Sequence, residues 1–300
     1  LHWRVPLQSG RRLEILMGFW PHDYDGAWTL EGPARRSGIG LHSGDQVSVT
    51  LQPSSQPGVW VSWPANGGEP LKLEPSQVRD SPLCTTLELG DRKLATVEHL
   101  LAAIAGCGLT HVHLEVEGSE IPLLDGSSQG WVEAIAEAGL VPASTPAPAR
   151  PQLQQPIALH RGSSVITATP AEQFMLVGVI DFPQPAIGRQ QCALELTPES
   201  FVAEIAPART FGFREQVDQL RAAGLIQGGA LDNALVCDGD QWLNPPLRYP
   251  DEPVRHKLLD LIGDLALVGF PRAQVLVYRG SHGLHTDLAA VLADRSDAQR

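Results

Sequence analysis

Residues 253–268 read P-V-R-H-K-L-L-D-L-I-G-D-L-A-L-V, and this stretch decides how the second half of the chain folds. Its apolar residues recur at helical spacing, which predicts one long helix. Within it His256, Asp260 and Asp264 follow one another at intervals of four. Their side chains are therefore expected in a row on one face of the helix.

This polar row has two interpretations. A histidine and an aspartate four residues apart can bind one divalent cation, and their nitrogen and oxygen ligands suit zinc. The alternative for His256 and Asp260 is a hydrogen bond on the helix surface. Asp260 and Asp264 are flanked by leucines. Two buried acids are costly without a cation or hydrogen-bond donors, and this favours a site.

A second helix is expected at residues 96–105, where apolar residues recur at three and four and Thr96 can cap the first turn. Glu98 and His99 lie on this helix. They would supply a base beside a further metal ligand. The alternative is a buried acid and histidine pair with a purely structural role.

Two other segments carry polar groups of interest. His282, in G-S-H-G-L, is expected where a strand gives way to a loop. A histidine there can act as general acid or base, because its usual pKa is close to neutral, or it can be a loop histidine in solvent. In A-R-T-F-G-F, Thr210 places a hydroxyl next to the ring of Phe211.

The remaining pattern alternates strands and helices in both halves of the chain. Expected strands are residues 46–52, 59–63, 85–89, 111–117, 164–169, 175–181 and 274–278. Expected helices are residues 96–105, 128–138, 198–206, 213–223, 253–268 and 284–293.

These elements predict an α+β fold of two similar domains, each a sheet packed against helices, with the active site between them. The proline-rich residues 142–156 are expected to be the linker. Domain I is then residues 29–141, which carry Glu98 and His99, and domain II is residues 157–300. Residues 1–28 are expected to be a poorly ordered N-terminal extension.

Composition excludes several classes of protein. The formal charge of −12 over 300 residues argues against binding to nucleic acid or to anionic lipid. The four cysteines form no C-x-x-C pair, so a cysteine zinc site and a disulfide scaffold are disfavoured and a cytoplasmic location is expected. No apolar run is long enough to predict a transmembrane segment.

Several segments together resemble one family, the UDP-3-O-acyl-N-acetylglucosamine deacetylases of lipid A synthesis, which are zinc amidohydrolases. The resemblance runs in order from about residue 30 to residue 293 and does not include residues 1–28. The matching segments are G-I-G-L-H-S-G at 38–44, L-C-T-T at 83–86, T-V-E-H-L at 96–100, E-I-P-L-L-D-G-S at 120–127, A-R-T-F-G-F at 208–213 and R-H-K-L-L-D-L-I-G-D at 255–264.

The resemblance implies a catalytic zinc ion bound by His99, His256 and Asp260, with Glu98 as the general base. It also implies that Asp264 orients His282. In this reading His282 is the electrostatic or general-acid partner, and Thr210 helps to hold the oxyanion.

The resemblance further implies which residues contact substrate. Lys257, expected to point away from the metal face, would contact the nucleotide diphosphate, and Phe182 the uracil, with Phe211 also in the substrate site. The helix after Thr210 and the segment that follows it, including Val217 and Ala230, would line a passage for the acyl chain. Packing of that helix into the core is the alternative that periodicity alone favours.

The function that the resemblance implies is hydrolysis of the 2-acetamido group of UDP-3-O-acyl-N-acetylglucosamine, with release of acetate. No protein partner is implied. One alternative is a zinc amidohydrolase that acts on another acylated amino sugar. Another is a homologue that binds the sugar nucleotide without turnover. This alternative is disfavoured because five residues of the implied site are intact: Glu98, His99, His256, Asp260 and His282.

Overall fold

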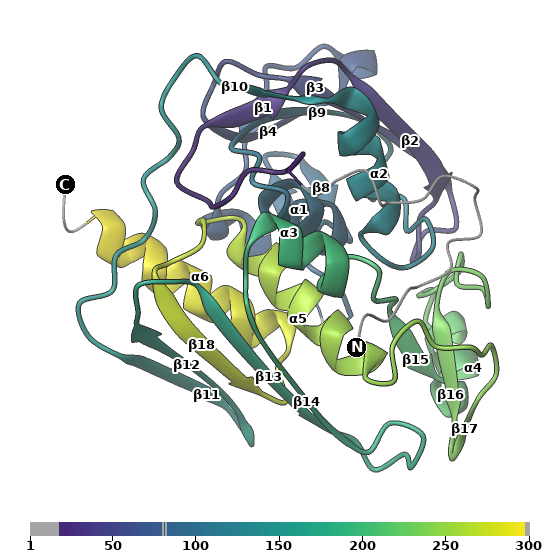
Figure 1. Ribbon diagram of the computed structural model, residues 1–300. Helices are drawn as coiled ribbons and strands as arrows, with labels where there is room; N and C mark the ends of the chain where they lie inside the picture. Colours follow the sequence, from purple (N-terminus) through teal and green to yellow (C-terminus); the bar gives the residue numbers. More distant parts are fainter. Residues whose placement is uncertain (1–17, 80, 82, 298–300) are drawn as a thin grey trace.

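The structure, a computed structural model, describes residues 18–79, 81 and 83–297. Two sheets form the outer layers, and helices from both halves of the chain fill the space between them (Figure 1). This mixed arrangement confirms the predicted α+β class. Among the described residues, no helix is both long and apolar enough to cross a bilayer.

The first sheet comes from the first half of the chain and has the order β10-β1-β9-β3-β2, with β4 paired to β9 and β5 paired to β4. Alternate residues of β3 and β9, such as Val49 opposite Val116, point into the core. Its strands are β1 (Trp28–Leu30), β2 (Ala34–Ile39), β3 (Gln46–Pro53), β4 (Gly58–Ser62), β5 (Leu71–Lys72), β9 (His111–Glu117) and β10 (Leu140–Pro142).

Helix α1 (Glu98–Gly106) lies at the centre of the molecule, and α2 (Gln129–Ala138) lies beside it (Figure 1). Every residue of α1 except Ala105 is buried. Its two polar residues, Glu98 and His99, must therefore find partners inside the protein. A small sheet precedes α1 and consists of β6 (Val78–Arg79), β7 (Thr86–Leu89) and β8 (Arg92–Leu94).

The second sheet has the order β11-β12-β18-β13-β14, with β13 and β18 parallel and the other pairs antiparallel. Helices α5 (Glu252–Leu265) and α6 (His282–Asp297) cover its inner face (Figure 1). Its strands are β11 (Ile157–Arg161), β12 (Ser164–Pro170), β13 (Met175–Asp181), β14 (Arg189–Glu195) and β18 (Ala273–Tyr278).

A smaller unit projects from the second half. It contains a three-stranded sheet and α4 (Arg214–Ala222), and lies at the lower right of Figure 1. Its strands are β15 (Phe211–Phe213), β16 (Leu235–Asp238) and β17 (Gln241–Trp242).

Most of the expected elements are present, with two differences in the helices. The expected helix at 198–206 is one turn, α3 (Pro198–Ser200), followed by a π-helix at Phe201–Ile205. The expected helix at 253–268 ends at Leu265, because a turn leads to Gly269 with a positive φ of 86°. Residues 143–156, in the expected linker, contain no helix or strand.

The expectation of a poorly ordered extension is wrong for residues 18–28. Trp20 is 6% exposed and belongs to the core. The Tyr24 hydroxyl donates to the carbonyl of Gly106 at 3.1 Å, and the Tyr24 ring packs edge-on against Phe270. Apolar burial thus fixes a segment that the resemblance did not cover. Residues 1–17 lie outside the described residues.

Candidate active site

The candidate site lies where α1 and α5 pack side by side between the two sheets (Figure 1). Gly263 of α5 permits this close approach. A Cβ atom at this position would lie 2.7 Å from the carbonyl carbon of Glu98 and 2.9 Å from its Cα atom. The first turn of α1 is therefore held directly against the middle of α5.

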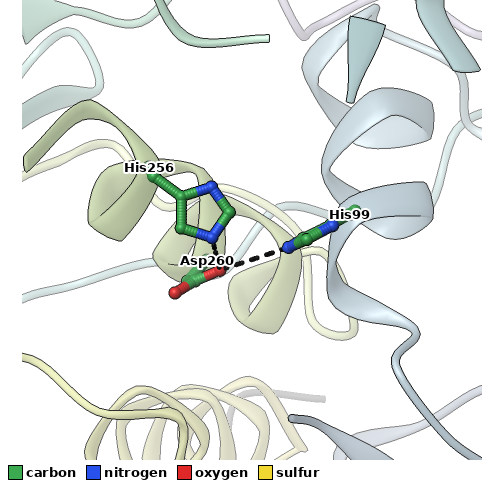
Figure 2. Close-up of side chains that lie close together, drawn as sticks. All are labelled: His99, His256 and Asp260. Carbon is green, nitrogen blue, oxygen red and sulfur yellow. Dashed lines mark ion pairs between the residues drawn. The ribbon is translucent and has the colours of Figure 1, made fainter. Parts of the chain in front are cut away.

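His99 from α1 converges with His256 and Asp260 from α5, as Figure 2 shows. The Asp260 Oδ1 atom lies 3.7 Å from His99 Nε2 and 3.3 Å from His256 Nε2. All three residues are buried, and one ligand atom from each lies within 4.8 Å of the other two. Donors in a tetrahedral zinc site are about 3.3 Å apart for bonds of about 2.0–2.1 Å. The three residues therefore fit a single metal ion.

A hydrogen bond leaves one ring nitrogen of His256 free to bind such an ion. Its Nδ1 atom lies 3.1 Å from the carbonyl oxygen of Ala208, so Nδ1 carries the proton and the Nε2 lone pair is free. Burial lowers the pKa of His256 to about 3. The imidazole is consequently neutral, which is the form that binds metals.

Lys257 is also at the site, and the expectation that it points away from the metal face is wrong. Its Nζ atom lies 2.8 Å from Asp260 Oδ2, because residues three apart are neighbours on a helix. Burial favours a neutral Asp260, but the charges of Lys257 and His282 outweigh this effect and hold the pKa of Asp260 well below its usual value. Asp260 is thus an ionised carboxylate.

Glu98, which precedes His99 on α1, also lies at the site. Its Oε2 atom accepts a hydrogen bond from the backbone N–H of Thr85 at 3.0 Å, and its Oε1 atom lies 3.9 Å from His282 Nε2. Burial raises the pKa of Glu98 to about 7. A carboxylate with this pKa is suited to accept a proton near neutral pH.

His282 is the first residue of α6 and is not a loop histidine in solvent. Its Nδ1 atom lies 3.0 Å from Asp264 Oδ2, and its Nε2 atom lies 3.9 Å from Asp260 Oδ2. Burial lowers the pKa of a histidine, but Asp264, Asp260 and Glu98 together raise that of His282 to about 10. His282 is therefore a proton donor whose Nε2 faces the cluster.

Two further polar residues belong to this arrangement and were not found from the sequence. The Thr85 hydroxyl donates to Asp264 Oδ1 at 2.5 Å, and His285 Nδ1 lies 2.9 Å from Asp264 Oδ2. Thr85 is in the L-C-T-T segment, and His285 follows His282 by three residues. The only signal for His285 was this helical spacing.

Aromatic rings connect the cluster to the unit that contains α4. The Phe211 ring lies 6.3 Å from the His256 ring, and the Phe182 ring lies 5.6 Å from those of Phe211 and Phe213. Thr210 precedes Phe211 and is half-buried, with its backbone N–H bonded to the carbonyl of Gly126 at 2.7 Å.

Helix α4 itself has no buried residue, so it does not pack into the core. Val217 is half-buried on α4, and Ala230 is exposed in the segment that follows. Helix α4 packs instead on β15 and β16 of the small sheet.

Comparison with known proteins shows which family this chain resembles. The model of the family described as UDP-3-O-acyl N-acetylglycosamine deacetylase matches residues 27–294. A protein of Thermosynechococcus vestitus named UDP-3-O-acyl-N-acetylglucosamine deacetylase is 48% identical over 270 residues, which are 89% of this chain and 94% of the relative. One from a Nostoc species with the same name is 47% identical over 270 residues, 87% of this chain and 96% of the relative.

A more distant relative is found in Arabidopsis thaliana. It is named probable UDP-3-O-acyl-N-acetylglucosamine deacetylase 1, mitochondrial, and is 39% identical over 283 residues, 87% of this chain and 86% of the relative. Both the family match and these identities extend over most of the chain. The chain therefore belongs to the UDP-3-O-acyl-N-acetylglucosamine deacetylase family.

Proposed function

We infer that this chain is a zinc-dependent deacetylase of lipid A synthesis. It hydrolyses the 2-acetamido group of UDP-3-O-acyl-N-acetylglucosamine and gives UDP-3-O-acyl-glucosamine and acetate. The observation that carries this inference is the convergence of His99, His256 and Asp260 beside Glu98 and His282, in a chain whose relatives are named for this deacetylation.

His99, His256 and Asp260 would hold the zinc ion. Two neutral imidazoles and one carboxylate are the ligands of a catalytic zinc site, in which a fourth position stays open. Zinc held by these residues would polarise the amide carbonyl and would lower the pKa of a water molecule from about 15.7 toward about 7.

Glu98 is the general base in this proposal. Its Oε2 atom is held by the N–H of Thr85, so Oε1 is left to take the proton of the attacking water. The tetrahedral oxyanion then meets two groups of this chain, the Nε2–H of His282 and the hydroxyl of Thr210. His282 afterwards donates its proton to the departing amine.

Substrate would lie along the groups that surround the cluster. Lys257 supplies a cation for the diphosphate, and Phe182 supplies a ring for the uracil. Val217 and Ala230 would contact the acyl chain, which the absence of buried residues on α4 supports. A cytoplasmic location stays a prediction, supported by the four cysteines, which are free thiols in the described residues.

Metal content and product formation test the reaction together. We expect one zinc ion per chain. We also expect mass spectrometry to show the loss of one acetyl group from UDP-3-O-acyl-N-acetylglucosamine. Asp260→Ala should lose both zinc and activity. Asp91→Ala is the matched control, because the Asp91 side chain is 95% exposed. Turnover of a different acylated amino sugar alone would support the first alternative, and affinity without product would support a non-catalytic homologue.

The acyl-chain assignment has its own test. Val217→Glu and Gln219→Glu each add one negative charge to α4, but Val217 is half-buried and Gln219 is exposed. We expect Val217→Glu to raise KM for a long-chain substrate and to leave KM for a short-chain analogue unchanged. Gln219→Glu should affect neither substrate. Equal effects of the two variants would contradict the assignment.

A further inference from the structure

Asp264 is the centre of a buried hydrogen-bonded array that includes a second histidine. His282 Nδ1 and His285 Nδ1 lie 3.0 and 2.9 Å from the same oxygen, Asp264 Oδ2. The Thr85 hydroxyl donates to the other oxygen, Oδ1. His285 is fully buried and three residues after His282 on α6, so both imidazoles face the same carboxylate.

The protons in this array can be assigned from the chemistry of its members. The pKa of Asp264 is lowered, because its histidine partners outweigh the effect of its burial. An ionised carboxylate only accepts hydrogen bonds, so both histidines present an Nδ1–H to it. His285 thus uses its Nδ1 donor on the acid that holds His282.

Packing alone does not account for a histidine at position 285. In the described residues, His285 Nε2 is buried and has no hydrogen-bond partner. The backbone of Gly280 closes over it, since a Cβ atom there would lie 2.5 Å from this nitrogen. Burying an unpaired nitrogen is unfavourable, and a leucine would fill the space without that cost. The Nδ1 contact to Asp264 is what distinguishes histidine from an apolar residue.

We propose that His285 is a positioning residue for the deacetylation. Together with Thr85 it fixes the Asp264 carboxylate, so that Oδ2 faces His282 Nδ1 and His282 Nε2 stays directed at the space between Glu98 and Asp260. His285 does not reach that space itself. This proposal rests on the proposed function for its kinetic consequences, but not for the geometry of the array.

Three substitutions test the position of the donor. Asparagine places an amide N–H close to where Nδ1 lies, glutamine places it near the position of Nε2, and leucine has no donor. We expect His285→Leu and His285→Gln to lower kcat about 10- to 100-fold, as is typical of residues that support the groups around a metal. KM and zinc content should stay as in the wild type, and His285→Asn should restore most of kcat.

A second mutation tests whether the effect passes through His282. In a His282→Ala background, His285→Leu should cause no further loss of kcat, because the residue that it positions is gone. Equal activity of the asparagine, glutamine and leucine variants would overturn the proposal. It would also be overturned if His285→Leu lowered kcat as much in the His282→Ala background as it does alone. If the leucine variant does not fold, the difference in kcat between the asparagine and glutamine variants still tests the proposal.

Nuclear magnetic resonance separates this proposal from the proposed function. With ¹⁵N-labelled histidine, the His282 ring should carry a proton on Nδ1 as well as on Nε2 in the wild type and in His285→Asn, and the Nδ1–H signal should change in His285→Leu. This measurement needs no turnover. If the wild type released no acetate, the proposed function would fail, while an unchanged His282 signal in His285→Leu would reject the positioning role.

Discussion

Gly263→Ala tests whether the close packing of α5 on α1 creates the site. A methyl group at this position would lie 2.7 Å from the carbonyl carbon of Glu98, whereas ordinary contacts begin at 3.4 Å. The atoms in the way belong to the backbone, which cannot move to another rotamer as a flexible side chain can. The two helices must therefore separate by at least about 0.7 Å at this point, the difference between these two distances, because the carbonyl oxygen of Glu98 lies closer still.

Two effects on stability oppose each other. Overpacking of a core costs about 1–3 kcal/mol, and replacing glycine by alanine within a helix gains about 1 kcal/mol. We expect overpacking to win, with a net loss of up to about 2 kcal/mol that lowers Tm by up to roughly 8 °C. Metal binding should suffer as well, because a separation of this size exceeds the tolerance of about 0.2 Å for metal–ligand distances.

Thermal unfolding with and without added zinc, together with the zinc content of the purified protein, measures both effects. Gly68→Ala is the control, because a Cβ atom at Gly68 meets nothing within 4 Å. Wild-type Tm and wild-type zinc affinity in Gly263→Ala would refute the reasoning. It would mean that α1 can shift without disturbing His99.

Three further outcomes are expected. Glu98→Gln should keep zinc and lose about 10² to 10⁴ in kcat, the range for a removed general base; an unchanged rate would leave Glu98 with a structural role only. Arg248, 2.7 Å away, and the hydroxyl and N–H of a neighbouring serine outweigh burial and lower the pKa of Asp125. The stability that this pairing contributes is present above the unfolded pKa of about 3.9 and is lost as the pH falls through the lower pKa of the folded state. Asp125→Asn should therefore make the free energy of unfolding depend less on pH below about 5. An unaltered pH dependence would contradict the pairing. Tyr24→Ala should cost about 3 kcal/mol in chemical denaturation, and Tyr24→Phe, which loses only the hydroxyl bond, about 1 kcal/mol; equal effects would show that the ring contributes little.

The sequence predicted those parts of the fold that have a strong local pattern. Residues 253–268 combine leucines at helical spacing with polar residues four apart, and the helix and its His256 and Asp260 pair are both present. Short strands such as β1 and β10 were not predicted, because three residues are too few to show an alternation. Their pairing depends on the rest of the sheet.

Contacts between distant segments were beyond sequence reasoning. Thr85 and Asp264 are 179 residues apart, and no local pattern indicates that they meet. The segment at 18–28 was misjudged for a different reason. It lies outside the family-like motifs, but its aromatic residues Trp20 and Tyr24 were a sign that it could be buried.

The division of the cluster between α1 and α5 determines when a newly made chain could bind the proposed zinc ion. While the ribosome is still adding residues before His256, the growing chain contains only one of the three clustered donors, His99. A single imidazole binds zinc weakly, so an unfinished chain should not compete for the ion with other proteins. Loading must wait until the α5 segment has been synthesised and has folded against α1. Capture of the proposed metal ion would thereby be linked to the late stages of folding, and an ion bound at this site would mark a chain whose two halves have already come together.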